Sequence, residues 1–512
     1  MSAQFDELST TSKETSTPTV RSQEDSIEVT NEVKLFAFCA ALNSCNLGFD
    51  IGVYTGASSL IQDDLGLSDT ELEIFLGSIN FFAIIGALGS AWFSDQYGRL
   101  HTFKMSAFIF NIGILFTIFA QGYWSLMVGR FFIGVGVGTG FAIDPIYIAE
   151  ISPAVHRGGL VTWSELATNF GIVLGFTSLL VYSPLSDGLQ WRMMVGTGGI
   201  LPLVMIYLSS YVMIESPRWL VAKNKAEEAE QNLTRLYPEG FAVTDVLEEI
   251  QESLMEEKRV QQDLGWGFFW NPPPAIRRML IVGIGAAGLQ QVVGIDAIQY
   301  YLIQILDDAG IEGNYEQAGW LIFLGILKFS FIFVAIKMFD TIGRRPLFFL
   351  SLTGMIIALL VLAFNFFGSK YEPVTIMSLG LYLIMFTIGM GPGSWLIPSE
   401  VFSTNIRAKA MSVATVTNRL VATIVSSTTL TAKNTIGFGT YFLILAGCCF
   451  LVLLFYIHVV PETKGKHLEE MTHYFAEITN DQSILELESR VSIIGDPTSP
   501  LLSGNGREST YV

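Results

Sequence analysis

The chain has 512 residues, of which 51% are hydrophobic and only 15% are charged. A mean hydropathy of +0.48 excludes an ordinary soluble enzyme of this length. The net charge is −18, and because the acids gather in the polar segments 1–32, 215–274 and 465–512, nucleic-acid binding has no basic patch to rest on.

Twelve apolar segments follow one another along the chain. A helix of about 20 apolar residues crosses a bilayer core of about 30 Å. Because every backbone polar group must be paired inside lipid, and this composition favours helices over a barrel, we predict an all-α membrane protein. The predicted transmembrane helices are 33–57, 72–94, 101–120, 124–148, 158–182, 192–214, 277–305, 315–338, 346–367, 376–402, 406–430 and 437–459.

The basic residues that follow the second, fourth, sixth, eighth and tenth predicted helices all fall on one side of the membrane. The positive-inside rule makes that side the cytoplasm, so we expect both termini to be cytoplasmic. The expected parts are a disordered cytoplasmic tail 1–32, a six-helix bundle 33–214, a cytoplasmic linker with short helices 215–274, a second six-helix bundle 275–460 and a mostly disordered cytoplasmic tail 461–512.

Short charged motifs recur at nearly the same offset in the two halves, which indicates a duplicated six-helix unit. Parallel six-helix repeats, with a site near the midplane between them, suit an alternating-access carrier. We predict that the charged motifs form ion pairs that hold the halves together when the cytoplasmic gate is closed; the alternative is generic loop charge. The predicted gate residues are Asp95, Arg99, Glu150, Arg157, Glu215, Arg218, Asp340, Arg344, Arg345, Glu400, Arg407 and Glu462.

Several motifs in order resemble the sugar porter family of the major facilitator superfamily over about residues 33–470: DQYGR, GRFFIGVGVGTG, PIYIAEISPAVHRG, ESPRWL, QQVVGID, DTIGRR, GPGSWLIPSEVF and PETKG. Within that family the chain is most similar to the proton-coupled polyol and monosaccharide transporters of plants. The resemblance implies the major facilitator fold, with twelve transmembrane helices in two six-helix bundles and an intracellular helical linker. Two positions depart from the pattern, namely Leu100 in place of a second basic residue and Asp144 in place of a small uncharged residue.

Ionisable residues inside predicted helices are functional candidates, because each costs about 2.5 kcal/mol or more at a helix centre. Asp50 lies in the first predicted helix, in an otherwise apolar or small-residue stretch. The resemblance places Arg130 beside it. A pair that opens and closes during transport would load a proton on one side and release it on the other, so we predict that Asp50 and Arg130 couple transport to protons; a static structural pair is the alternative.

Sugars and polyols are arrays of hydroxyl groups, which carboxylates and amides recognise well. Gln290, Gln291 and Asp296 lie close together in the seventh predicted helix, and Gly294 between them favours a local break. We also predict a bend near Pro392 in the tenth helix. The resemblance places the substrate-binding residues around a central cavity: Glu165, Gln290, Gln291, Asp296, Lys328, Trp395, Asn418 and Arg419. The alternatives are that the two glutamines only join helices, and that Lys328 and Arg419 only balance Glu165 and Asp296.

These observations predict a secondary active transporter, and not an enzyme, that imports a polyol or monosaccharide with a proton. The alternatives are a facilitative uniporter and a sugar sensor that does not transport. We expect no cofactor other than the coupling proton, no metal, and the lipid bilayer as surroundings. The plasma membrane is the expected location, with the vacuolar or another organellar membrane as the alternative, and the C-terminal Ser509–Val512 could bind a scaffold domain.

Overall fold

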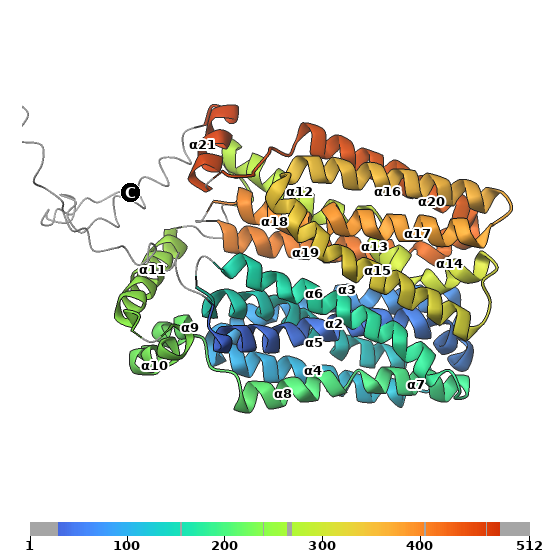
Figure 1. Cartoon of the computed structure of the whole chain (residues 1–512), viewed down its shortest axis with the longest axis horizontal. Coiled ribbons are helices and arrows are strands. Elements are labelled where there is room, and N and C mark those ends of the chain that lie inside the picture. Colours follow the sequence, from blue (N-terminus) through green and yellow to red (C-terminus); the bar gives the residue numbers. More distant parts are fainter. Residues whose placement is uncertain are drawn as a thin grey trace, which may run out of the picture.

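The computed structural model describes residues 29–153, 156–238, 240–263, 269–403, 406–466 and 468–481, without the side chains of residues 256–263, 340, 468 and 469. All regular secondary structure in these residues is helical. The long helices run side by side in two bundles, and the chain passes once from the first bundle to the second (Figure 1).

The first bundle contains the six transmembrane segments expected from the sequence. The sixth is formed by two helices, α7 and α8, which together make one apolar span from Asp187 to Tyr211. Its helices are α2 (Asn31–Leu65), α3 (Asp69–Tyr97), α4 (Arg99–Ile118), α5 (Tyr123–Ile151), α6 (Arg157–Tyr182), α7 (Asp187–Thr197) and α8 (Ile200–Tyr211).

Glycines let α2 and α6 approach within backbone contact. A Cβ on Gly48 would lie 1.8 Å from the Thr168 carbonyl oxygen, and one on Gly52 would lie 2.4 Å from that of Ile172. Only a residue without a side chain fits at this distance, so the first segment can lie deep inside its bundle, with most of its residues buried.

The second bundle repeats this plan, and the interruptions in its helices include one at Gly294 and one before Pro392. Its elements are α12 (Pro274–Val292), α13 (Ile295–Tyr300), α14 (Leu302–Asp308), α15 (Asn314–Thr341), α16 (Arg344–Phe367), α17 (Glu372–Met385), a π-helix (Phe386–Met390), α18 (Gly391–Val401), α19 (Arg407–Ser426) and α20 (Thr429–His458).

These two interruptions lie at or beside the positions that the sequence marks. Gly294, with φ of +88°, separates α12 from α13 in a conformation that favours glycine. The π-helical turn ends just before Pro392, which has no N–H for the regular ladder. The irregularity expected at Pro392 therefore occupies the turn before it.

Eleven helices of the described residues are long and apolar enough to cross a membrane. The predicted span 406–430, which forms α19, is not one of them because it is rich in Thr and Ser and carries Arg407, Lys409 and Arg419. Helix α19 nevertheless packs against α12 of its own bundle and α3 of the other. Its polar residues therefore face protein at the junction of the two bundles.

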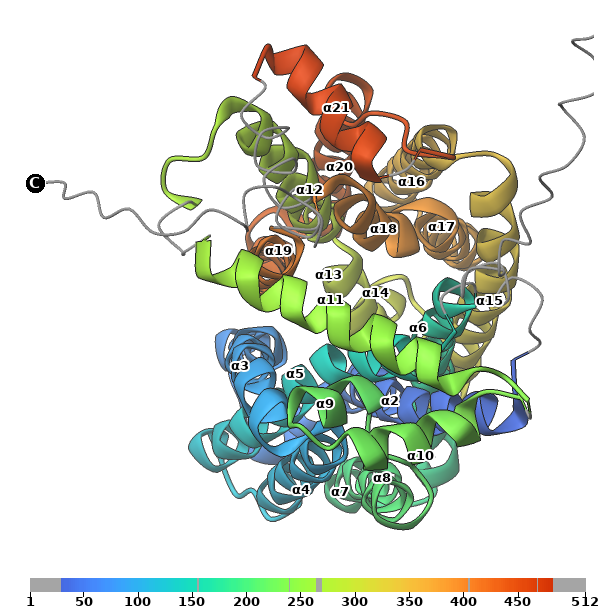
Figure 2. The ribbon, with the colours of Figure 1, turned by 90° about the vertical axis from the view of Figure 1, so that its left-hand side faces the viewer.

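Four short helices gather at one end of the molecule: α9 (Pro217–Ala222), α10 (Ala226–Leu236), α11 (Val243–Asp263) and α21 (Leu468–Thr479). This end is called the linker end below, and the opposite end, where α7 and α14 lie, the far end (Figure 1). Seen from the linker end, α11 lies across the boundary between the bundles (Figure 2). Helix α21 falls in the segment 461–512 that we expect to be mostly disordered, and residues 482–512, with the suggested scaffold-binding end, lie outside the described residues.

Side-chain hydrogen bonds join the two bundles at the centre and towards the far end. Thr55 of α2 donates to the Gln299 carbonyl oxygen at 3.1 Å, and Gln304 of α14 donates to the Ser58 hydroxyl at 2.9 Å. Closer to the far end, Asn434 of α20 donates to Asp69 of α3 at 2.6 Å. The two bundles are thus joined on the far side of the molecular centre.

Candidate substrate and proton site

Asp50 of α2 and Arg130 of α5 form a buried ion pair. The Arg130 Nη1 atom lies 3.1 Å from Asp50 Oδ2 and 3.3 Å from Oδ1. Asp50 is 3% exposed and Arg130 is 0% exposed, so water does not screen the pair. The two residues predicted to couple protons are therefore in contact, inside the first bundle.

The rest of the Arg130 guanidinium is held by groups other than Asp50. It donates to the carbonyl oxygens of Phe75 at 3.3 Å and Leu76 at 3.4 Å, and it lies 4.1 Å from the centre of the Tyr54 ring. Among the described residues, the Asp50 side chain has no hydrogen-bond partner other than Arg130. Protonation of Asp50 would therefore remove its charge attraction while Arg130 stays fixed.

A second charged group lies at the centre, between the bundles. Asn80 of α3 donates to Asp296 of α13 at 3.2 Å, and its amide oxygen accepts from Arg419 of α19 at 2.9 Å. The Arg419 guanidinium also lies 5.1 Å from the centre of the Phe141 ring. One amide of the first bundle thus joins an acid and a base of the second.

The sequence analysis did not select Asn80. The available signal was an amide in the middle of an otherwise apolar segment, LGSINFFAIIG, where an unpaired polar group is costly. Its partners are distant in sequence, and only the three-dimensional structure shows that it contacts Asp296 and Arg419.

Lys328 and Glu165 complete a set of two acids and two bases around the centre. Lys328 donates to the Gln299 side chain at 3.0 Å and is almost fully buried. Glu165 is exposed and accepts from Asn169 at 3.1 Å. With Asp296 and Arg419 these charges sum to zero, so the site suits an uncharged ligand that carries many hydroxyl groups.

The predicted amide ligands differ in how many of their hydrogen bonds are already made to other protein groups. Gln290 donates to the Gly391 carbonyl oxygen at 2.7 Å and accepts from Asn418 at 2.9 Å, so its amide joins α12, α18 and α19. These contacts favour the joining role for Gln290. The buried oxygens of Gln291 and Asn418 have no hydrogen-bond donor among the described residues, so they are available to a hydroxyl group.

Trp395 of α18 in the second bundle contacts Phe141 of α5 in the first bundle. Its half-buried ring packs edge-on against Phe141, with the ring centres 6.1 Å apart. An indole at a bundle boundary offers an apolar face to C–H groups and an N–H to an oxygen. The candidate substrate residues therefore come from both bundles.

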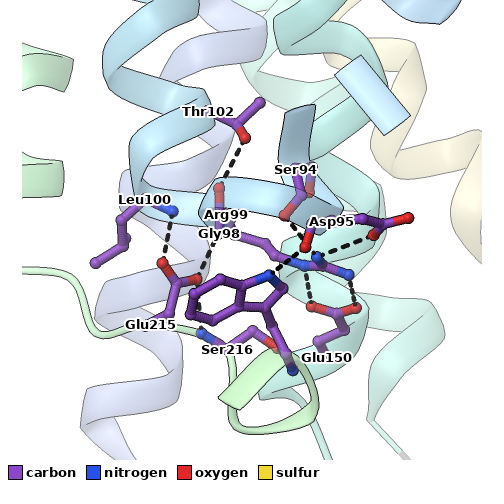
Figure 3. A network of polar contacts seen from close by, with 10 residues as sticks. Ser94, Asp95, Gly98, Arg99, Leu100, Thr102, Glu150, Glu215 and Ser216 are labelled. Atoms are coloured by element: carbon purple, nitrogen blue, oxygen red, sulfur yellow. Dashed lines mark hydrogen bonds and ion pairs between the residues drawn. The ribbon is translucent and has the colours of Figure 1, made fainter. Parts of the chain in front are cut away.

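At the linker end, four of the predicted gate residues, Asp95, Arg99, Glu150 and Glu215, form one cluster (Figure 3). Arg99 donates to both Glu150 oxygens, at 2.7 and 2.8 Å, and contacts Asp95 at 3.3 Å. Glu215 accepts from the backbone N–H groups of Arg99 at 2.8 Å and Leu100 at 3.2 Å. Burial raises the pKa of the Glu215 carboxyl above its ordinary value, against the effect of these hydrogen bonds.

The second bundle has the same arrangement. Arg344 contacts Glu400 at 2.6 Å, and Glu462 accepts from the backbone N–H groups of Arg344 at 3.0 Å and Arg345 at 2.9 Å. Burial tends to raise the pKa of Glu462, but hydrogen bonds from the Lys464, Arg345, Arg344 and Thr463 backbones outweigh burial and lower it. Glu215 thus caps the first turn of α4, and Glu462 caps the first turn of α16 at the equivalent position of the other half.

Two of the gate ion pairs lie within single bundles in this structure, and the expectation that the gate residues join the halves when the cytoplasmic gate is closed stays a prediction. Arg99–Glu150 lies within the first bundle and Arg344–Glu400 within the second. The reason is local: each arginine opens its helix and meets the end of a neighbouring helix of the same bundle. Of the other gate residues, Arg157 is exposed, Arg218 and Arg407 are half-buried, and the side chain of Asp340 lies outside the described residues.

Two bundles built from one repeated unit, around a central polar site, define a membrane carrier of the major facilitator type. Residues 36–475 match the Sugar (and other) transporter family, and the chain belongs to that family. It is similar to the probable polyol transporter 4 of Arabidopsis thaliana, with 36% identity over 86% of this chain and 84% of that protein. It is also similar to the galactose-proton symporter of Escherichia coli (strain K12), with 30% identity over 85% of this chain and 92% of that protein.

Solved structures give the same result for the fold. An inward-open conformation of the xylose transporter from Escherichia coli has a TM-score of 0.75 and 27% identity, covering 86% of this chain and 99% of that one. The expected fold, an all-helical carrier with two six-helix bundles, is therefore confirmed, and α19 takes its place as a transmembrane helix of that fold.

Proposed function

We propose that this chain is a proton-coupled symporter that imports a polyol or a monosaccharide by alternating access. The observation that carries the proposal is the contact between Asp50 and Arg130, a fully buried acid and base inside the bundle that faces the substrate site. The names of the relatives, polyol transporters and a galactose-proton symporter, support the same class of substrate and ion.

The coupling follows from the charge of the pair. When Asp50 is ionised, its attraction to Arg130 holds α2 against α5; when Asp50 is protonated, that attraction is lost and the helices are free to shift. Loading the proton from the far end and releasing it at the linker end would drive the solute in the same direction. The carboxylate, amide, ammonium and guanidinium groups at the centre would bind the hydroxyl groups of the solute.

The orientation and membrane form part of the same proposal. The linker end, with its many Lys and Arg residues, faces the cytoplasm, and the chain lies in the plasma membrane. In this orientation the contacts between bundles close the outer side. No cofactor besides the proton takes part in this cycle.

Uptake into proteoliposomes with an imposed pH gradient tests the proposal. We expect labelled solute to accumulate against its gradient only when the exterior is more acidic, with a panel of glucose, fructose, sorbitol, mannitol, xylitol and inositol as competitors. Uptake that merely equilibrates, at a rate that ignores the pH gradient, would identify a facilitative uniporter. Binding of a panel member without any uptake would identify a sensor.

A further inference from the structure

A second carboxyl group is fully buried in the first bundle, apart from the Asp50–Arg130 pair. Asp144 lies in α5 next to Pro145 and is 0% exposed. Its Oδ1 atom accepts from Asn43 Nδ2 at 2.9 Å, and its Oδ2 atom is hydrogen-bonded to the Ser44 hydroxyl. Both partners come from α2, so Asp144 lies between the two helices that also carry the proton-coupling pair.

Asp144 has no cation as a partner in the described part of the chain. The charged and titratable groups on α5 and on the helices packed against it include no hydrogen-bond or ion-pair partner of Asp144 among the described residues. They are Glu32, Lys34, Cys39, Cys45, Asp50, Tyr54, Asp63 and Asp64 on α2; Asp69, Glu71, Glu73, Asp95 and Tyr97 on α3; Arg99, His101 and Lys104 on α4; Tyr123, Arg130, Tyr147 and Glu150 on α5; Arg157, Glu165 and Tyr182 on α6; and Arg218 on α9. A buried carboxylate without a cation is costly, and uptake of a proton relieves that cost.

The hydrogen bonds of Asp144 suit both of its protonation states. The Asn43 amide nitrogen only donates, so it fixes Oδ1 as an acceptor in either state. The Ser44 hydroxyl both donates and accepts, so it can donate to an ionised Oδ2 or accept from a protonated one. The group can therefore gain or lose a proton without repacking the helices.

A small cavity lies beside Asn43, the residue that donates to Asp144. Its volume is about 10 Å³, the lower limit for one water molecule, and its lining includes Asn43, Asn46 and Ser106. The Asn46 amide oxygen is buried and has no hydrogen-bond donor among the described residues. Asn43, Asn46 and Asp50 follow one another at spacings of three and four along one face of α2, over about 10 Å of helix.

We propose that Asp144 is a second proton-binding site, which takes up the proton that Asp50 releases. The proposal rests on the proposed proton coupling. A proton that leaves Asp50 restores its carboxylate and its pairing with Arg130, and the proton forms an O–H bond on Asp144, which loses its negative charge. Asn43 and Ser44, the partners of Asp144, precede Asp50 in α2, and the start of α2 contacts α10 of the linker end, so Asp144 holds the proton on the way to that end.

Infrared difference spectra of the full chain in liposomes, recorded while the pH is changed, test the proton-binding site directly. We expect a carbonyl band of a protonated carboxylic acid that titrates with pH in the wild type. One component of the band should be lost in Asp144→Asn, remain in Asp50→Asn, and shift in frequency in Ser44→Ala, which keeps the carboxyl but removes its hydroxyl partner. Ser44→Ala keeps the test valid if Asp144→Asn does not fold.

A pH-dependent spectrum that is the same in the wild type, Asp144→Asn and Ser44→Ala would overturn the proposal. Solute-driven proton entry into proteoliposomes is the second measurement, and we expect Asp144→Asn to slow it. If the wild type shows no solute-driven proton entry, the proposed symport fails, while the infrared band still decides whether Asp144 binds a proton. If Asp144→Asn drives proton entry at the wild-type rate, Asp144 is not on the proton path.

Discussion

Asn80 is the residue that joins the charges of the central site. Its amide donates to Asp296 and accepts from Arg419, and it belongs to the opposite bundle. A substrate hydroxyl group, which also donates and accepts, has the same capacity as this amide. Without solute, Asn80 therefore fixes Asp296 and Arg419 in place. When solute binds, its hydroxyl groups have to fit beside this amide or replace its hydrogen bonds.

Replacing Asn80 with alanine removes both hydrogen bonds and leaves Asp296 and Arg419 without this partner. A hydrogen bond to a charged group contributes about 1.5–3 kcal/mol, so we expect the half-saturating solute concentration to rise about tenfold or more. The measurement is the concentration dependence of solute uptake in proteoliposomes. Asn111→Ala is the matched control, because that amide bonds only within its own helix α4. Equal half-saturation in the wild type and Asn80→Ala would contradict this role.

Glu215 and Glu462 have equivalent positions but opposite pKa shifts, and this predicts opposite pH dependence. Because the pKa of Glu215 is raised in the folded state, ionisation of this group lowers the folding stability as pH rises. The free energy of unfolding of Glu215→Gln should therefore increase relative to that of the wild type between about pH 4 and pH 7. Because the pKa of Glu462 is lowered in the folded state, its ionised form stabilises the fold above its unfolded pKa, and this stability is lost as pH falls. The free energy of unfolding of Glu462→Gln should therefore fall furthest below that of the wild type at about pH 7.

Thermal unfolding of the purified protein in detergent, at several pH values, measures both differences. Each variant is compared with the wild type, and the readout is how the difference in stability changes with pH. The absolute difference is not used, because glutamine also changes the hydrogen bonds. Slopes of the same sign for the two variants would show that burial does not dominate at Glu215.

Helix α3 provides the strongest connection to α20 of the other bundle. Glu73 of α3 is buried and accepts a hydrogen bond from the Thr431 backbone N–H at 2.9 Å, and its other oxygen is hydrogen-bonded to the Thr431 hydroxyl. Thr431 lies in the first turn of α20, where the helix dipole favours a negative charge. One carboxylate therefore holds two helix ends together towards the far end.

Glu73→Ala should open the far end more often. The loss of a charged hydrogen-bonded contact of about 1.5–3 kcal/mol changes the balance of open and closed forms by about tenfold or more. Spin labels at the exposed residues Asp63 and Glu312, one on each bundle, would report the opening as a longer distance between labels. Glu372→Ala, an exposed acid at the start of α17, is the control. An unchanged distance distribution in Glu73→Ala would show that other contacts hold this end.

The sequence predicted most elements of the fold because length and apolar composition decide which segments span a membrane. It also located the helix break at Gly294, since the cause is local. The ion-pair partners were not predictable in the same way. Motif spacing shows that Glu150 and Arg99 are charged, but their contact depends on how α4 and α5 pack. For the same reason Asn80 and the neighbours of Asp144 emerged only from the structure.

The molecule as a whole combines two bundles, each with its own internal contacts, and hydrogen bonds join the bundles at the centre and towards the far end. Each bundle keeps its own arginine–glutamate pair and its own anchoring glutamate at the linker end. Because these bonds lie within bundles, they need not break when the bundles move against each other. The moving parts are therefore the central site and the far-end contacts.

Asp50→Asn should separate proton coupling from solute movement. The neutral side chain cannot release a proton, so we expect accumulation driven by a pH gradient to disappear, while exchange of labelled for unlabelled solute persists. Both are measured in the same proteoliposomes. Asp63→Asn, an exposed carboxylate in the same helix α2, is the control and should behave as the wild type. Accumulation by Asp50→Asn at the wild-type level would mean that Asp50 and Arg130 are a static pair.

The polar composition of α19 has a consequence for how the protein is made. The other transmembrane segments are apolar enough to enter a bilayer alone, whereas α19 carries Arg407, Lys409 and Arg419. During synthesis this helix gains a favourable place only beside α12 and α3, which have already been inserted. Biogenesis of the second bundle thus depends on the first, so the two halves of the duplicated unit are no longer independent building blocks.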